Sequence, residues 1–298
     1  MEQQDLAVLN RQAIAAAKQH MGLVAWGTVA LTAATLAGYV ATLWLAITGV
    51  LPLWAGVALL GALTYLAYTP LHEAAHGNIH GDRAGLKWLN ELCGYISAQM
   101  IMVPYGTHRV EHFTHHRYTN QPGKDPDHVV SGMGGGAWPF VKAVVHFVWN
   151  QWTFLFHGYW ATAPLHEKLI YVAEVVTALG WRVALVVALP WQQGVLLVPV
   201  AWFVGALFTA YWFAYRPHHP YDETARYRNT SSLVMPVWMK PFEWFWLGQN
   251  LHSIHHAFPR VPFYRYHALF REIEPVLRAH GGPVLGVFSR RPLAPAVR

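Results

Sequence analysis

The chain has 298 residues, of which 54% are hydrophobic and only 12% are charged. A soluble globular domain carries about twice that share of charged residues, so the composition excludes an ordinary soluble protein and favours one that crosses a membrane several times. The formal net charge is +6, but its basic residues are interspersed with aromatic ones and no nucleic-acid-binding motif is present. This pattern favours contact with a lipid surface and gives no indication of nucleic acid as a partner.

The first apolar stretch lies between Lys18 and Glu73, where no Asp, Glu, Lys or Arg occurs. One crossing of a bilayer needs about 20 apolar residues, so this stretch accommodates two crossings, which we place at about 22–47 and 53–71. Gly49 and Pro52 are typical of a turn between them. The two crossings are therefore predicted to form a hairpin.

Two shorter apolar segments follow, at residues 89–106 and 138–158. Each is too short or too interrupted for a crossing, and periodicity alone does not settle its position. We expect both to be interfacial or half-buried helices.

A second hairpin is predicted from crossings at about 169–189 and 195–215, with the turn in the sequence LPWQQG. Glu174 and Arg182 lie inside its first arm. Charges at membrane depth are costly and usually face the interior of a helix bundle or reach towards an interface. These two residues leave the depth of that helix open.

The topology follows from the distribution of basic residues. The two predicted turns, near residues 50 and 192, contain no Lys or Arg, whereas the N-terminal arm, the middle segment and the C-terminal region contain nearly all of them. The positive-inside rule then places these three regions, and both termini, in the cytoplasm. The single cysteine, Cys93, excludes an intrachain disulfide and fits a reducing compartment. We predict one domain over residues 1–298, an all-α membrane protein of four transmembrane helices, interfacial helices and a histidine-rich cytoplasmic cap.

Histidines are concentrated in the predicted cytoplasmic regions. Four clusters occur: HEAAH (His72, His76), HFTHH (His112, His115, His116), RPHHPY (His218, His219) and HSIHH (His252, His255, His256). Residues three and four apart share one face of a helix, whereas residues three apart on a strand point to opposite sides. The spacing therefore presents convergent imidazoles if the segments are helical. Convergent neutral imidazoles are metal ligands.

The number of histidines indicates the kind of site. A structural zinc ion takes four protein ligands and a catalytic one takes three, so eight boxed histidines and one from RPHHPY suit two ions. Imidazole alone does not distinguish iron from zinc, copper or nickel. Isolated histidines, such as His267, are expected to bind no metal.

Other polar residues flank the boxes. Glu73 and Glu111 point about 100° away from the neighbouring ligands around a helix, so we expect them to face solvent or to orient ligands. Six further residues are predicted to hold the ligands in place from outside the site: His108, Asp125, Asp127, His128, His219 and Asn250.

The three boxes, behind paired transmembrane hairpins, resemble those of the integral-membrane fatty acid desaturase superfamily. Three stretches are similar to the desaturase-like beta-carotene hydroxylases in particular: EHFTHHRYTNQPGKDPDH, YRPHHPYDETARYRNT and GQNLHSIHHAFPRVPFYRYHALFREIEPVL. The resemblance covers roughly residues 65 to 280. An arginine is expected after His218, where this chain has His219. Either histidine is therefore a candidate ligand, and His218 keeps the position after Pro217.

The resemblance implies two non-haem iron ions that activate dioxygen. Their ligands would be the nine histidines His72, His76, His112, His115, His116, His218, His252, His255 and His256. The implied substrate is a lipid, either a carotenoid that is hydroxylated on its ring or a fatty acyl chain that is desaturated. The chain has no Rossmann fingerprint and one cysteine, so electrons are expected from a separate donor such as ferredoxin with its reductase. A metal transporter or non-catalytic metal-binding protein is the alternative of another class, and it would hold its ligands at the bilayer midplane.

Overall fold

The computed structural model describes residues 3–289 and 291–293 of the chain. The described part is almost entirely helical, with one small sheet. Up to residue 162 the elements are α1 (Gln3–Lys18), α2 (Trp26–Ile47), α3 (Leu53–Ala75), η1 (Ala84–Leu86), α4 (Lys87–Ile101), α5 (Tyr105–Tyr118), η2 (Pro126–Gly135), α6 (Ala137–Thr153), η3 (Phe154–Phe156) and α7 (Tyr159–Thr162). The remainder are α8 (Leu165–Ala188), α9 (Trp191–Val195), η4 (Leu196–Val200), α10 (Ala201–Thr209), η5 (Ala210–Tyr215), β1 (Ser232–Val234), η6 (Val237–Met239), α11 (Lys240–Phe245), α12 (His252–Ala257), η7 (Phe263–Arg265), α13 (Tyr266–Ala279) and β2 (Val284–Gly286).

Four helices are long and apolar enough to cross a membrane, which confirms the predicted fold class. They are Trp26–Ile47, Leu53–Ala75, Leu165–Ala188 and Trp191–Tyr215. The last is one continuous span made of α9, η4, α10 and η5. The helices at 165 and 191 begin four residues earlier than predicted, immediately after Pro164 and Pro190. The apolar run alone did not show these starts, because the first turn of α8 carries the polar residues His166, Glu167 and Lys168.

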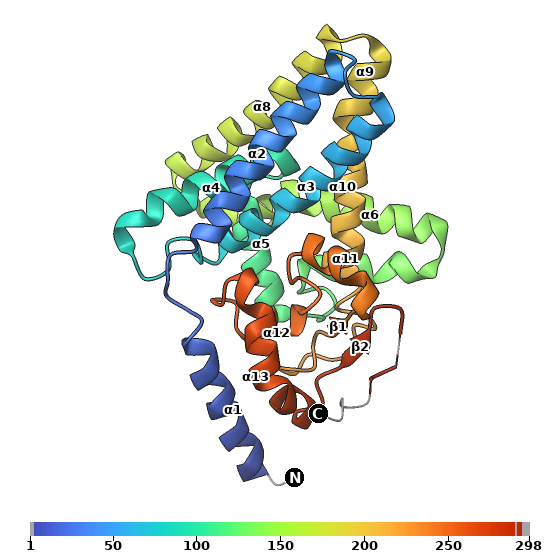
Figure 1. Ribbon diagram of the computed structural model, residues 1–298. Helices are drawn as coiled ribbons and strands as arrows, with labels where there is room; N and C mark the ends of the chain where they lie inside the picture. The colour runs from blue at the N-terminus through green and yellow to red at the C-terminus, as the bar shows by residue number, and fades with distance from the viewer. Residues whose placement is uncertain (1–2, 290, 294–298) are drawn as a thin grey trace.

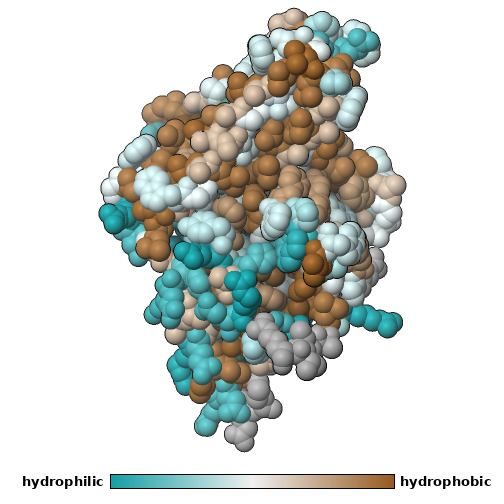
Figure 2. Space-filling model, in the orientation of Figure 1, coloured by the Kyte–Doolittle hydropathy of each residue, from teal (hydrophilic) through white to brown (hydrophobic). Residues whose placement is uncertain are grey.

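The two hairpins form one end of the molecule and the histidine-rich cap forms the other (Figure 1). The turn after α2, where Gly49 has a φ of 77°, and the turn before α9 lie together at the far end of the hairpins. Figure 2 shows apolar side chains over the hairpin half and more hydrophilic ones over the cap. This division fits a protein whose hairpins lie in a bilayer.

The two hairpins contact each other through small residues of α3 and α10. A Cβ atom at Gly205 would lie 2.6 Å from the carbonyl oxygen of Gly61, and one at Gly61 would lie 2.8 Å from a methyl group of Val204. Glycine is therefore required for the two helices to approach so closely. The contact aligns the span that leads into the first histidine box with the span that leads to His218.

The cap consists of α1, the segment after η5, and the C-terminal elements. Ala13 and Ala17 of α1 are fully buried in the same apolar core as Leu269 and Ile273 of α13. Strand β1 pairs with β2 in parallel, with Ser232 opposite Val284. This core supports α12, which carries the third histidine box.

The two charged residues inside α8 bind the ends of two neighbouring helices. Arg182 donates hydrogen bonds to the carbonyl oxygens of Gln99 and Met100, at 2.8 and 2.9 Å, where α4 ends. Glu174 accepts a hydrogen bond of 2.7 Å from the backbone nitrogen of Tyr105, where α5 begins. A cation thus stabilises a helix C-terminus and an anion a helix N-terminus, in agreement with the helix dipoles. The charges that left the depth of α8 open face the bundle interior and set the turn between α4 and α5.

Glu174→Leu is expected to weaken metal binding by the predicted histidine site without preventing membrane insertion. The substitution leaves the Tyr105 N–H, at the start of the helix that carries the second histidine box, without its acceptor, which costs about 1–3 kcal/mol. Purified protein should be assayed for bound metal and for thermal stability. Glu167→Leu, on the first turn of the same helix, is the matched control, and equal losses in both variants would contradict this role for Glu174.

Candidate metal centre

Four segments far apart in sequence bring their histidines together where the hairpins meet the cap. The first box lies at the C-terminal end of α3, the second on α5, His218 just after η5, and the third on α12. The helical positions of all three boxes agree with the spacing argument. Of the nine predicted ligands, His116 and His256 are half-buried and the other seven are buried.

A first group contains five histidines, whose ligand atoms all lie within 4.8 Å of one another: His72, His76, His112, His116 and His255. Their Nε2 atoms form an unbroken series. The distance is 3.0 Å from His72 to His255, 2.7 Å from His255 to His116, 3.1 Å from His116 to His112 and 2.9 Å from His112 to His76. Three of the four segments contribute to this group.

A second group contains His115, His218 and His256, with His252 between the last two. The Nε2 atom of His252 lies 3.1 Å from that of His218 and 3.1 Å from that of His256. His256 is in turn 3.3 Å from the Nε2 atom of His115. The two groups adjoin, since the rings of His116 and His256 stack with their centroids 4.3 Å apart.

The HxxHH spacing divides each box between the two groups. On α5, His112 and His116 are four residues apart and join the first group, while His115 turns to the second. On α12 the pair is His252 and His256, which joins the second group, while His255 turns to the first. Each of these two HxxHH boxes thus supplies an i, i+4 pair to one group and a single residue to the other. The first box adds a further pair and His218 a further single residue.

The outward-facing Nδ1 atoms are held by groups around the cluster. His115 Nδ1 lies 2.8 Å from Asp125 Oδ1, His218 Nδ1 lies 3.1 Å from Asn120 Oδ1, and His255 Nδ1 lies 3.1 Å from the Tyr266 hydroxyl. A partner on one ring nitrogen fixes the ring orientation and leaves the other nitrogen for a metal. These partners therefore direct Nε2 into the cluster.

Burial keeps the histidines outside the membrane spans neutral. It lowers the pKa of His76 to about 3 and that of His108 to about 4, and it also lowers the pKa of His112, His116 and His255. Neutral imidazole is the form that binds metal.

His115 differs from the other histidines of the cluster. Burial disfavours its charged form, but the carboxylates of Asp125 and Asp127 outweigh burial and raise its pKa to about 9. These carboxylates make the ring a stronger donor to a cation.

The distances within the cluster fit bound metal ions. Two imidazole nitrogens that bind one ion at right angles, each about 2.1 Å from it, lie about 3.0 Å apart. The Nε2 separations in both groups are 2.7 to 3.3 Å. The acceptors on Nδ1 of His115 and His218 leave their Nε2 atoms as lone-pair donors that face other imidazole nitrogens. Cations placed between these rings would satisfy such lone pairs. The donor set therefore fits two metal ions of the kind that imidazole binds.

Three of the six residues predicted to orient ligands contact histidines of the cluster, namely Asp125, Asp127 and His108. Asp125 and Asp127 contact His115, at 2.8 and 3.7 Å, and the ring of His108 stacks on that of His112. His128 lies against Tyr221, whose ring stacks on that of His218, so this tyrosine lies between His128 and the cluster.

His219 and Asn250 are directed elsewhere. The ring of His219 lies against Tyr215, while His218 is the one in the cluster. The Asn250 amide donates to Leu233 O and Glu243 Oε1, at 2.9 and 3.2 Å. Its predicted role beside the ligands has no support from these contacts, because the chain turns before α12 and directs the side chain to β1 and α11.

Glu73 and Glu111 are fully buried, so of the two positions predicted for them, facing solvent or orienting ligands, the first is wrong. Glu73 accepts a hydrogen bond from the backbone nitrogen of Phe263, since the segment before α13 covers that side of α3. Burial raises the pKa of Glu111 to about 7, with Asp127 and Gln151 as its polar neighbours. Both side chains lie beneath chain segments that helix periodicity alone does not predict.

Sequence reasoning missed three residues that connect the cluster to the membrane side. Tyr68 lies one turn before His72 and stacks on its ring at 6.0 Å. Phe213 contacts the rings of both His72 and His252. Gln151 of α6 lies with Oε1 2.9 Å from His108 Nδ1. Phe213 is part of the π-helical segment η5, a distortion that is frequent at functional sites, but the sequence contained no signal for it.

The chain is similar to known proteins of one family. A family model described as fatty acid desaturase matches residues 48–287. The chain is also similar to the Delta(12) fatty acid desaturase of Caenorhabditis elegans, with 37% identity over 49 residues, which is 16% of this chain and 13% of that relative. The family match includes all three histidine boxes and three of the four apolar helices, and it begins directly after the first of them, α2.

Proposed function

Because this chain belongs to the fatty acid desaturase family, we propose that its two histidine groups hold two non-haem iron ions and that the protein uses dioxygen to oxidise the hydrocarbon of a membrane lipid. The observation that supports this most directly is the convergence of nine imidazoles into two adjoining groups. When bound, a reduced iron pair supplies electrons to dioxygen and so provides an oxidant strong enough for an unactivated C–H bond.

The residues of the chain prepare the site for that chemistry. The first group would hold one iron through five histidines, and the second would hold the other through His115, His218, His252 and His256. Asp125, Asn120 and Tyr266 keep three of the rings turned inwards. Tyr68 and Phe213 belong to two of the membrane spans and pack against the histidine rings from the membrane side. Their rings would help to exclude water from the reacting carbon.

We propose that the metal site and both termini lie on the cytoplasmic side. The histidine cluster lies at the end of the spans and not at their midplane, since His72 and His76 come at the end of α3. This position disfavours the alternative of a metal transporter. Measuring the accessibility of engineered cysteines from either side of intact cells tests the orientation.

The electron donor is proposed to be a small acidic protein such as ferredoxin with its reductase. The cluster comes nearest to the surface at the half-buried residues His116 and His256. Exposed basic side chains follow each of these boxes, at Arg117 and Arg260. Positive charge beside the surface edge of the metal site would attract an acidic carrier.

Arg117→Glu is expected to slow reduction by an acidic carrier by about 3- to 10-fold at low ionic strength, with the difference shrinking as salt screens the charges. Stopped-flow reduction measured over a range of salt concentrations checks this. Lys142→Glu on α6 makes the same charge change away from the boxes and should have little effect. A reduction rate that does not respond to salt in any variant would contradict an acidic donor.

The favoured reaction is hydroxylation of a carotenoid ring. It rests on the sequence outside the histidines that is similar to the beta-carotene hydroxylases, namely DPDH, ARYRNT and GQN. Desaturation of a fatty acyl chain is the second candidate, and one observation favours it. The similarity to a Delta(12) fatty acid desaturase points to acyl lipids.

Expression in a host that makes beta-carotene distinguishes the two reactions. We expect oxygenated carotenoid with unchanged unsaturation of the membrane fatty acids, both measured by mass spectrometry. New double bonds in the fatty acids with untouched carotene would assign the second reaction and leave the proposed iron site in place. A His72→Ala variant expressed at the same level is the control for activity of the host.

A further inference from the structure

An apolar groove lies on the outside of the hairpin half, between α6, α8 and α10. Its volume is about 450 Å³. The lining includes Val145 and Trp149 of α6, Leu179 of α8 and Phe203 of α10. α8 and α10 belong to membrane spans, so hydrocarbon of the bilayer and not water would cover this groove. A lipid chain can lie in such a groove without leaving the hydrocarbon of the bilayer, so no free energy is spent on transferring the chain out of it.

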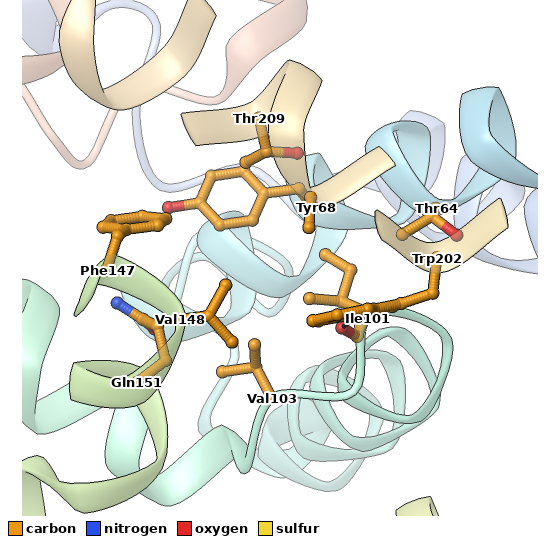
Figure 3. Close-up of a pocket in the computed structure, with 10 residues that line it drawn as sticks. Thr64, Tyr68, Ile101, Val103, Phe147, Val148, Gln151, Trp202 and Thr209 are labelled. Carbon is orange, nitrogen blue, oxygen red and sulfur yellow. Dashed lines mark hydrogen bonds between the residues drawn. The ribbon is translucent and has the colours of Figure 1, made fainter. Parts of the chain in front are cut away.

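A small inner cavity lies directly behind the groove, and the two share Val148 and Trp202 as lining residues. The inner cavity has a volume of about 30 Å³, which is space for one or two water-sized groups. Figure 3 shows Trp202 and Ile101 on one side of this cavity and Tyr68, Phe147 and Gln151 on the other. Trp202 donates a hydrogen bond of 2.5 Å from Nε1 to the carbonyl oxygen of Ile101, which holds its ring between the two spaces.

The far side of the inner cavity reaches the histidines. Tyr68 contacts the rings of His72 and His108, at 6.0 and 5.5 Å between centroids, and Gln151 contacts His108. A series of touching residues therefore leads from the bilayer to the first histidine group: the groove, Trp202, the inner cavity and Tyr68.

Helix α6 lines both the groove and the inner cavity. Val145, Trp149 and Trp152 line the groove, whereas Phe147 and Gln151 line the inner cavity. Residues four apart share a helix face, so α6 presents one face to each space. It separates them except at Val148 and Trp202, which belong to both.

We propose that the lipid substrate enters sideways from the bilayer, with its hydrocarbon lying in the groove between α6, α8 and α10, and that Trp202 gates its passage to the histidines. This inference rests on the oxidation of a membrane lipid proposed above, and it names the route and the residues that select the substrate. The inner cavity is too small for a ring or a run of methylenes, so the Trp202 ring must move for substrate to reach the site. The width of that opening would determine which hydrocarbons react.

The test places tryptophan at two neighbouring positions of α6. Val145 and Val141 are one helical turn apart and similarly exposed, at 54% and 43%, but only Val145 lines the groove. Val145→Trp should lower product formation by about 10- to 100-fold, the range by which a poorly fitting pocket discriminates. Val141→Trp should leave it unchanged. Both variants should keep the wild-type iron content, because neither position contacts a histidine of the cluster.

A second measurement identifies the occupant of the groove without relying on turnover. The photoreactive residue p-benzoylphenylalanine is placed at position 145 or 141 in membranes that contain the substrate, and the adducts are analysed by mass spectrometry. We expect the substrate to be enriched at position 145 relative to 141. The same mixture of bulk phospholipid at both positions would mean that the groove holds only surrounding lipid, and would overturn the proposal.

The outcomes separate this inference from the proposed function. If the wild type oxidises a lipid but Val145→Trp and Val141→Trp are equally active, the route is wrong and the function stands. If the wild type, loaded with iron and supplied with reductant, oxidises neither carotenoid nor acyl lipid, the proposed function is wrong, whatever the adducts show. Trp202→Phe, which keeps an aromatic ring but loses the hydrogen bond to Ile101, should widen the range of accepted hydrocarbons. An unchanged range would contradict the gate.

Discussion

His255→Ala should abolish activity and remove the iron proposed for the first histidine group, while the protein still inserts into the membrane. His255 is fully buried and central to that group, with Nε2 3.0 Å from His72 and 2.7 Å from His116. Loss of a residue that only orients a metal ligand costs about 10- to 100-fold, so loss of a ligand should cost more than about 100-fold. Iron per protein chain and product formation in membranes check the prediction.

Two variants of α13 provide the comparison for His255→Ala. Tyr266→Phe removes only the hydroxyl that contacts His255 Nδ1 and should lower activity by about tenfold, the milder end of the effect of an orienting group. His267→Ala should be mild, because that side chain is 38% exposed and faces Glu243 at 3.9 Å. If His267→Ala proved as damaging as His255→Ala, the division between ligands and bystanders would be wrong.

The sequence predicted the four membrane helices and the helical placement of the histidine boxes, because both depend on local periodicity. A run of about 20 apolar residues indicates a span without knowledge of its neighbours. The spacing HxxHH likewise places an i, i+4 pair and one further imidazole on adjoining faces of a helix. The spacing did not show that the second and third boxes contribute to the two groups in opposite ways. The second box supplies its single residue, His115, to the second group, whereas the third box supplies its single residue, His255, to the first group.

The residues that support the site depend on contacts between segments far apart in sequence. Asp125 and Asn120 follow the second box closely and do reach its neighbourhood, but Tyr266 and Gln151 come from α13 and α6. Asn250 stands two residues before His252 and yet turns away, so nearness in sequence was a poor guide to nearness in space. The role of α8 was equally hidden, because the sequence does not show that α4 ends beside Arg182.

The purified, active protein is expected to contain two iron ions per chain, and its activity should require both dioxygen and an external reductant. The nine imidazoles form two adjoining groups whose Nε2 separations of 2.7 to 3.3 Å match ligands of a common ion. The described part of the chain contains no cysteine cluster that would hold an iron–sulfur centre, since Cys93 is its single cysteine. Elemental analysis of iron and zinc, together with oxygen uptake measured with and without reductant, checks the prediction.

Removal and return of the metal make this prediction specific to iron. Treatment with a chelator should abolish activity, and ferrous iron should restore it, whereas zinc should bind the same imidazoles without restoring activity, because Zn²⁺ has no redox chemistry. His115→Ala, which removes a ligand of the second group and leaves the five histidines of the first group intact, should reduce the iron content from two ions towards one. Active protein that holds one zinc ion and no iron would refute the assignment of the cluster as a diiron site.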